Sequence, residues 1–143
     1  TFQKWPSSLN KATDLERLDF RRNELASLPS SLGRLKQIHE LDLSYNNIQR
    51  LPLSIGNLQE LRSLSLADNS LSNLPATMRM LQQLQELNLG YNRFRTIPDA
   101  IRQLPAITTL LLPGNRVKLV PPSCQLPALK HLDIRWNTAE KLT

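Results

Sequence analysis

Asparagine and proline recur along this chain at a constant interval of 23 residues. Asparagine stands at positions 23, 46, 69, 92 and 115, and proline stands at positions 6, 29, 52, 75, 98 and 121. A fixed period of this length is typical of solenoid proteins, in which one small structural unit is stacked repeatedly. The period therefore limits the architecture to a stack, and it moves the search for function from enclosed pockets to exposed faces.

Aliphatic residues hold fixed positions within each unit, which reads Leu-x-x-Leu-x-Leu-x-x-Asn-x-Leu-x-x-Leu-Pro-x-x-Leu-x-x-Leu. Units start at residues 15, 38, 61, 84 and 107, after a half repeat at 1–14 and before a partial repeat at 129–143. The fifth unit is one residue shorter than the others, so Leu126 takes its next core position. One unit cannot bury its own leucines, so neighbouring units must share a core. A length of 143 residues suits one domain, and we expect a single domain over 1–143.

Each part of the unit predicts a local structure. The alternation Leu-x-Leu places its leucines on one face of a short strand and the intervening residues on the other face. Asparagine stands where the chain leaves the strand, and its amide is able to donate and accept hydrogen bonds toward adjacent turns. Proline suits the first position of a helical turn, so a short helix is expected after it, as at residues 30–35.

This pattern resembles the leucine-rich repeat family over nearly the whole chain, because five units match in register. The resemblance implies an α/β fold: a right-handed leucine-rich repeat solenoid with a six-stranded parallel concave sheet and short helical or 3-10 turns on the convex side. A 23-residue unit with Leu-Pro is similar to the intracellular class, which includes scaffold proteins, plant Ras-group repeats and bacterial effectors. For this class the resemblance implies recognition of a protein partner through the concave face.

Composition supports an intracellular setting. The chain has one cysteine, Cys124, so it cannot form an internal disulfide, and it has no Asn-x-Ser/Thr site. Cys124 is expected at a buried apolar position of the fifth unit. No apolar run approaches the length of a membrane span. The formal net charge of +6 favours acidic partners in general.

The concave face is expected to carry the partner-binding residues, since the x positions of the strands and the strand exits point there. The candidate residues are Arg17, Asp19, Arg21, Arg22, Glu40, Asp42, Tyr45, Asp68, Glu86, Asn88, Tyr91, His131, Asp133, Arg135 and Trp136. Asp19 and Asp42 are expected about 5 Å apart on adjacent strands, where like charges repel. Two interpretations remain open for the charged residues: a surface network of ion pairs, and a polar patch offered to a partner.

Aromatic residues fall in one column of the strand exits, at Tyr45, Tyr91 and Trp136. They are interpreted either as interface anchors or as rings that lie flat on neighbouring turns. A second surface is a basic edge of four cations that follow two asparagines: Arg93, Arg95, Arg116 and Lys118. Such an edge is a weaker candidate for an acidic partner or nucleic acid. Nucleic acid is not the favoured ligand, because no aromatic residues interleave with these cations.

The sequence does not predict an enzyme, although Thr109, His131 and Asp133 are expected near one another on the sheet. That set has no oxyanion donor and no water-excluding cleft. No cofactor, metal site or small-molecule substrate is expected, because no phosphate loop or metal-ligand cluster occurs. Both ends of the chain cut through a repeat, so we expect a fragment of a longer protein. The alternative function is therefore substrate recognition within a larger enzyme, such as a bacterial effector ubiquitin ligase.

Overall fold

The computed structural model describes residues 1–120, 126–138 and 141–142, so the expected position of Cys124 lies outside the described residues. Six three-residue strands form one parallel sheet in chain order, which confirms the predicted fold. They are β1 (Arg17–Asp19), β2 (Glu40–Asp42), β3 (Ser63–Ser65), β4 (Glu86–Asn88), β5 (Thr109–Leu111) and β7 (His131–Asp133). A second sheet pairs β6 (Leu119–Val120) with β8 (Lys141–Leu142), also in parallel.

The strands pair with the register that the repeat dictates. The middle leucine of each strand lies opposite the middle leucine of the next, beginning with Leu18 and Leu41. The same register continues through β4 and β5, where Leu87 lies opposite Leu110. Equivalent positions of all six units are therefore aligned in columns across the sheet, about 4.8 Å apart from one strand to the next.

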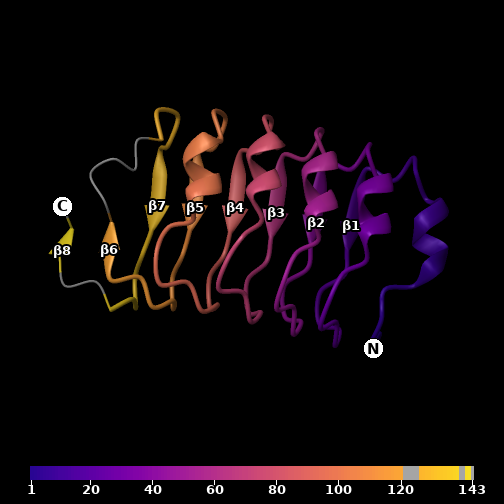
Figure 1. Cartoon of the computed structure of the whole chain (residues 1–143), viewed down its shortest axis with the longest axis horizontal. Helices are drawn as coiled ribbons and strands as arrows, with labels where there is room; N and C mark the ends of the chain where they lie inside the picture. Colours follow the sequence, from indigo (N-terminus) through magenta and orange to yellow (C-terminus); the bar gives the residue numbers. More distant parts are fainter. Residues whose placement is uncertain (121–125, 139–140, 143) are drawn as a thin grey trace.

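Within the described residues, five short 3-10 helices form a second row alongside the strands (Figure 1). They are η1 (Ser7–Lys11), η2 (Ser30–Arg34), η3 (Leu53–Asn57), η4 (Ala76–Met80) and η5 (Asp99–Gln103). The proline before each of these five helices takes the N-cap and not the first helical position, as at Pro29 with ψ of 159°. Its carbonyl accepts a hydrogen bond from the backbone N–H three residues later, at 3.1 Å from Leu32. The preset φ of proline thus stabilises the corner before the helix.

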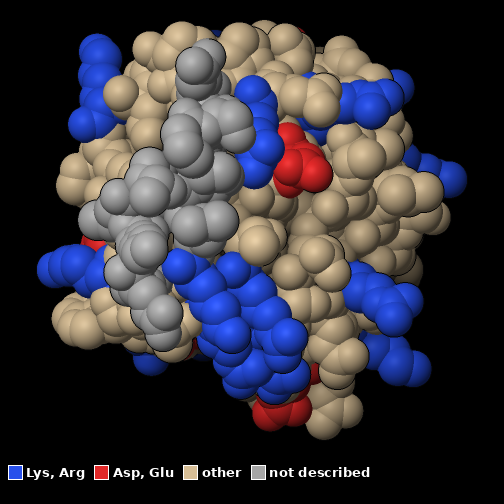
Figure 2. Space-filling view, turned by 60° about the vertical axis from the view of Figure 1, so that its left-hand side comes forward, with Lys and Arg blue, Asp and Glu red and all other residues tan. Residues whose placement is uncertain are grey.

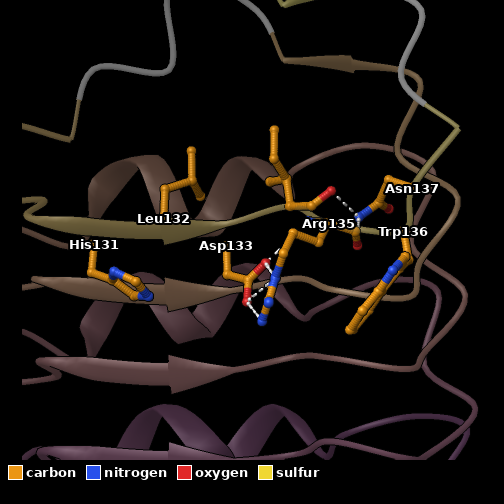
Figure 3. A pocket seen from close by; sticks show the side chains of 7 residues that line it. His131, Leu132, Asp133, Arg135, Trp136 and Asn137 are labelled. Carbon is orange, nitrogen blue, oxygen red and sulfur yellow. Dashed lines mark hydrogen bonds and ion pairs between the residues drawn. The ribbon is translucent and has the colours of Figure 1, made fainter.

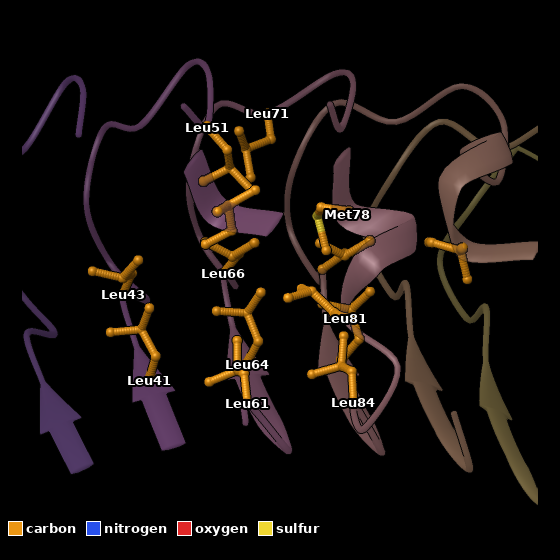
Figure 4. Close-up of a cluster of buried hydrophobic side chains, with 14 of the residues drawn as sticks. Leu41, Leu43, Leu51, Leu61, Leu64, Leu66, Leu71, Met78, Leu81 and Leu84 are labelled. Carbon is orange, nitrogen blue, oxygen red and sulfur yellow. The ribbon is translucent and has the colours of Figure 1, made fainter. Parts of the chain in front are cut away.

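Leucine side chains from strands, turns and 3-10 helices fill the space between the two rows (Figure 4). The central leucines are almost fully buried, and Leu87 is 1% exposed. At the N-terminal end, Phe2 and Trp5 pack against Phe20 with ring centroids 5.3 and 5.4 Å away. At the last strand of the sheet, Leu132 is 39% exposed, so this end of the core is less covered within the described residues.

The asparagines form the hydrogen-bonded column that the repeat predicts. The amide nitrogen of Asn69 donates to the carbonyls of Leu43 and Leu66, at 3.0 and 3.1 Å. Its Oδ1 accepts from the backbone N–H of Ile48 at 2.9 Å. Asn46, Asn92 and Asn115 make the same contacts and are also buried. Each asparagine therefore joins its own turn to the preceding unit and satisfies backbone groups that stacking removes from water.

The residue before each asparagine adopts the left-handed conformation, with φ between 54° and 65° in all six units. We call these six residues the strand-exit column: Arg22, Tyr45, Asp68, Tyr91, Gly114 and Trp136. Backbone N–H groups of this column donate to carbonyls of the next unit, for example from Tyr45 to Ala67 at 2.9 Å. The column is thus fixed by the ladder, although five of its members are not glycine and pay a conformational cost.

Candidate functional site

We call the face of the main sheet that carries the x positions of the strands the concave face, after the expectation from the sequence. Its N-terminal half is a network of ion pairs. Arg21 donates to both oxygens of Asp19, with Nε–Oδ1 and Nη2–Oδ2 distances of 2.9 and 2.8 Å. The same Nε lies 3.5 Å from Oδ2 of Asp42. One guanidinium therefore stands between the two aligned carboxylates and offsets the repulsion that the sequence predicts. The hydrogen bond from Arg21 holds the pKa of the Asp19 carboxyl below its ordinary value.

Other charges in this half are also paired. Arg17 lies 3.6 Å from Glu40, with both side chains more than half exposed. Asp42 accepts from the hydroxyl and from the backbone N–H of Ser44, at 2.5 and 3.0 Å. Arg17 thus contacts the neighbouring strand and does not flank Asp19 as an ion-pair partner. Exposed pairs of this kind contribute little to stability. Their charges are nevertheless paired within this half of the face, so few of them are left for a partner.

The C-terminal half has one ion pair in aromatic surroundings (Figure 3). Arg135 donates to both oxygens of Asp133, at 3.0 Å from Nε to Oδ1 and 2.8 Å from Nη2 to Oδ2. This contact holds the pKa of the Asp133 carboxyl below its ordinary value. The guanidinium carbon of Arg135 also lies 4.9 Å from the centre of the Trp136 ring. In Figure 3, His131, Asp133 and Trp136 extend from one side of β7 and Leu132 from the other.

Tyr91 and Trp136 meet across the intervening unit because that unit has glycine in the strand-exit column. Their ring centroids are 6.3 Å apart, with an angle of 33° between the ring planes. A Cβ added at Gly114 would lie 2.4 Å from Cδ1 of Tyr91, so the tyrosine ring occupies the space above this glycine. Leu111 and Pro113 carry no charge beside this cluster. We call Tyr91, Gly114, Arg135 and Trp136 the aromatic cluster.

Tyr45 has a different neighbour, since the guanidinium carbon of Arg22 lies 5.0 Å from its ring centre. The three aromatic side chains remain accessible: Tyr45 is 49% exposed, Tyr91 is 47% exposed and Trp136 is 65% exposed. The interpretation that a ring lies on a neighbouring turn describes Tyr91, and the interpretation as interface anchors stays a prediction. Tyr91 covers its neighbouring turn at Gly114, and about half of its surface is still available for contact.

Asp68 completes the strand-exit column between the two tyrosines. Its backbone N–H donates to the carbonyl of Gly90 at 2.9 Å, and its side chain is half-buried. Burial raises the pKa of this carboxyl above its ordinary value. Within residues 1–120 and 126–138, no hydrogen bond or ion pair reaches the carboxylate.

The remaining predicted residues lie on the sheet with fewer contacts. Asn88 accepts from the backbone N–H of Gly90 at 3.0 Å, which repeats the turn seen at Asp19 and Asp133. Glu86 is exposed on β4. His131 lies opposite Thr109, but Asp133 bonds to Arg135, and the described structure has no hydrogen bond among the three. The geometry that a catalytic triad requires is not formed there.

In the described part of the chain, no three or more His, Cys, Asp or Glu side chains are placed to hold a metal ion. None of the described helices has the length and hydrophobicity required to cross a membrane.

The basic edge forms where the chain leaves two neighbouring asparagines. Backbone hydrogen bonds join these turns, from Arg116 to Phe94 at 2.8 Å and from Lys118 to Arg95 at 3.3 Å. The four cations are exposed, and none has an ion-pair partner among the described residues. Figure 2, turned to bring the C-terminal side forward, shows basic side chains gathered there and few acidic ones.

Two features of the site were not predicted from the sequence. The first is the left-handed backbone of the strand-exit column, whose only sequence signal is Gly114 at the position before an asparagine. The second is the contact between Tyr91 and Trp136, which are two units apart in the stack. Its signal is the same glycine, because a missing side chain leaves room for a ring from the unit before.

Two sequence profiles of known proteins that match this chain have the same description. A sequence profile described as leucine rich repeat matches residues 59–117, and a second profile with the same description matches 14–35 and 37–58. A search of curated proteins gave no match.

Among solved structures, a leucine-rich repeat protein of Leptospira interrogans is similar, with 31% identity and a TM-score of 0.75 over 95% of this chain. PEPR1 in its complex with AtPEP1 gives 31% identity and a TM-score of 0.81 over 94% of the chain. TLR13 in its complex with ssRNA13 gives 26% identity and a TM-score of 0.84 over 96%. The chain spans 41% of the first of these proteins and 20% of each of the other two.

Proposed function

Because this chain belongs to the leucine-rich repeat family, we propose that it is a protein-binding module whose partner docks on the concave face. The observation that carries the proposal is the aromatic cluster. Tyr91 and Trp136 are rigidly placed by the backbone ladder and by Gly114, and both remain about half exposed or more. Aromatic residues and arginine are the side chains that most often contribute large binding energies at protein interfaces.

The two halves of the face have different roles in this proposal. In the N-terminal half the carboxylates of Asp19 and Asp42 already have a cation between them, so a partner gains little by approaching them. In the C-terminal half the aromatic rings present apolar surface that is removed from water on binding. The aromatic cluster therefore supplies affinity, and the charged half supplies electrostatic complementarity around it.

Among the structures that this chain resembles, one is a complex of PEPR1 with AtPEP1 and another is a complex of TLR13 with ssRNA13. By their names, the first complex suggests a polypeptide ligand and the second a nucleic-acid ligand for proteins of this fold. The aromatic cluster favours the polypeptide here. The chain spans less than half the length of these proteins, so we assign it the recognition step alone.

A displayed library of random linear peptides tests the proposal. Peptides are selected on the wild-type chain, and their dissociation constants are measured by fluorescence polarisation on variants. Replacing Tyr91→Ala together with Trp136→Ala should weaken the selected peptides by about 2 kcal/mol or more, which is about thirtyfold in Kd. The control double variant, Arg17→Ala with Glu40→Ala, should stay within about fivefold, because it removes an exposed ion pair.

Circular dichroism and urea unfolding show whether each variant remains folded. Peptides that bind both double variants as tightly as the wild type would place the binding surface elsewhere. A library that yields no binder to the folded wild-type chain would contradict a peptide-binding concave face.

A further inference from the structure

Asp68 is the only acidic member of the strand-exit column, and it lies at the middle of the stack. Its left-handed backbone and its hydrogen bond to Gly90 fix the direction in which the side chain leaves the turn. The carboxylate is half-buried, so it is partly desolvated even without a partner. A carboxylate in such a place requires a compensating cation or hydrogen-bond donor.

The molecule does not supply that cation within its described residues. Asp19 and Asp133 each bind an arginine two positions later in the chain. The residue two positions after Asp68 is Ser70, which has no cationic group. Two arginines at the column, Arg22 and Arg135, are each stacked on an aromatic ring at 5.0 and 4.9 Å. Arg93, in the unit after Asp68, makes no ion pair with it among the described residues.

Two tyrosines are the neighbours of Asp68 in the strand-exit column. Tyr45 belongs to the unit before Asp68 and Tyr91 to the unit after it, and the backbones of adjacent units are about 5 Å apart. Both rings are about half exposed. The faces of aromatic rings attract cations, and the attraction is strongest where water is partly excluded. A carboxylate that is unpaired among the described residues, in a column with two exposed aromatic side chains, therefore favours a cation, on a chain whose formal net charge is +6.

We propose that the space over Asp68, between Tyr45 and Tyr91, receives a lysine or arginine side chain of the protein partner. The proposal deepens the proposed function and rests on it, since the cation belongs to a polypeptide that docks on the same face. Its physical basis is charge complementarity. Docking removes the remaining water from Asp68, and only a partner that carries a cation there compensates the carboxylate. Partners without one are rejected, so Asp68 sets specificity while the aromatic cluster sets affinity.

The raised pKa of the Asp68 carboxyl agrees with this assignment, because burial without a cation disfavours its charged form. The chain offers an isosteric variant in Asp68→Asn, which keeps the shape and removes the charge. Asparagine tolerates the left-handed conformation, so this variant is expected to fold. Asp14→Asn is the matched control, because Asp14 lies in the turn before β1 and its replacement changes the net charge equally.

The peptides selected on the wild-type chain provide the probe. We expect them to share a lysine or arginine at one aligned position. Asp68→Asn should weaken their binding about tenfold or more, as for loss of a hydrogen-bonded ion pair, and Asp14→Asn should leave it unchanged. Replacing the shared cation of a peptide by glutamine should cause a similar loss on the wild type and almost no further loss on Asp68→Asn.

Additive losses in this double-mutant cycle, or selected peptides without a shared cation, would overturn the assignment of Asp68. If such peptides still lose affinity on Tyr91→Ala with Trp136→Ala, the proposed function stands and only the cation site is wrong. If no peptide depends on Tyr91, Trp136 or Asp68, both proposals are wrong.

Discussion

The first and last strands of the main sheet end in nearly the same turn, Asp-Phe-Arg-Arg-Asn at 19–23 and Asp-Ile-Arg-Trp-Asn at 133–137. In both turns the aspartate accepts from the backbone N–H of the arginine, at 3.1 and 3.0 Å, and binds its guanidinium through two atoms. The surroundings differ. Beside the first turn lies a second carboxylate, Asp42, whereas beside the second lies the neutral Leu111.

This difference decides what each turn presents to a partner. Arg21 forms ion pairs with two carboxylates, so its positive charge is neutralised by residues of the sheet itself. Arg135 has one carboxylate and lies over the ring of Trp136, which in turn contacts Tyr91. The same local sequence thus gives a neutralised surface at one end and an aromatic surface at the other. Neighbouring units, and not the turn itself, determine the recognition chemistry.

The largest effect we expect concerns the core that supports the two turns. Replacing Leu87→Ala in β4, midway between them, should lower the free energy of unfolding by about 2–5 kcal/mol, because it leaves a cavity in a fully packed region. Leu132→Ala, beside the second turn, should cost less because Leu132 is already 39% exposed. Urea unfolding measures both. Equal losses would mean that the two positions are equally well packed in solution.

An intermediate effect on stability is expected at Gly114. This glycine lies next to the second turn and leaves room for the contact between Tyr91 and Trp136, which the first turn lacks. Gly114→Ala adds a side chain at φ of 65° and displaces the ring of Tyr91. The variant should lose about 1–2 kcal/mol of stability. It should also change the near-ultraviolet circular dichroism that arises from Tyr91 and Trp136. Gly90→Ala is the comparison variant, because its backbone is outside the left-handed region and its added Cβ would lie 3.0 Å from Cγ of Pro113, so it adds crowding without the left-handed strain. An unchanged spectrum for Gly114→Ala would contradict the ring contact.

The smallest effect concerns the pH dependence of the two turns. Arginine lowers the folded-state pKa of Asp19 and Asp133, so each contributes stability at pH above its unfolded-state pKa. That contribution is lost as the pH falls through the lowered folded-state pKa. Carboxyl carbon NMR should give both pKa values below the ordinary value of 3.8. Arg21→Gln should raise the first and Arg135→Gln the second, and an aspartate that does not respond would show that its turn is not formed.

The sequence predicted the parts of this fold that depend on the period alone. Aligned leucines, a parallel sheet and bonded asparagines follow from repeating one unit, because identical positions then become neighbours. The ion-pair partner of each arginine could not be predicted from the period. Whether Arg17 or Arg21 contacts Asp19 depends on side-chain rotamers, which spacing does not fix.

The strand-exit column shows a second limit of the sequence. Asparagine and glycine are the residues that most readily take a left-handed backbone, but five of these positions carry other residues. The ladder of backbone and asparagine hydrogen bonds overrides their intrinsic preference. The sequence therefore placed Tyr45, Tyr91 and Trp136 in one column, as the structure does, but it did not predict the space above Gly114 that brings the last two together.

The spacing of the parallel strands has a consequence for any extended polypeptide that lies across them. Columns of this sheet repeat about every 4.8 Å, whereas side chains on one side of an extended chain repeat about every 6.6 Å. The two intervals come closest near every fourth unit, where four column intervals span about 19.2 Å and three side-chain intervals about 19.8 Å. Side chains of an extended ligand would therefore meet equivalent columns only at widely separated units. Inserting a single repeat between two such units would move the second contact away from its ligand side chain.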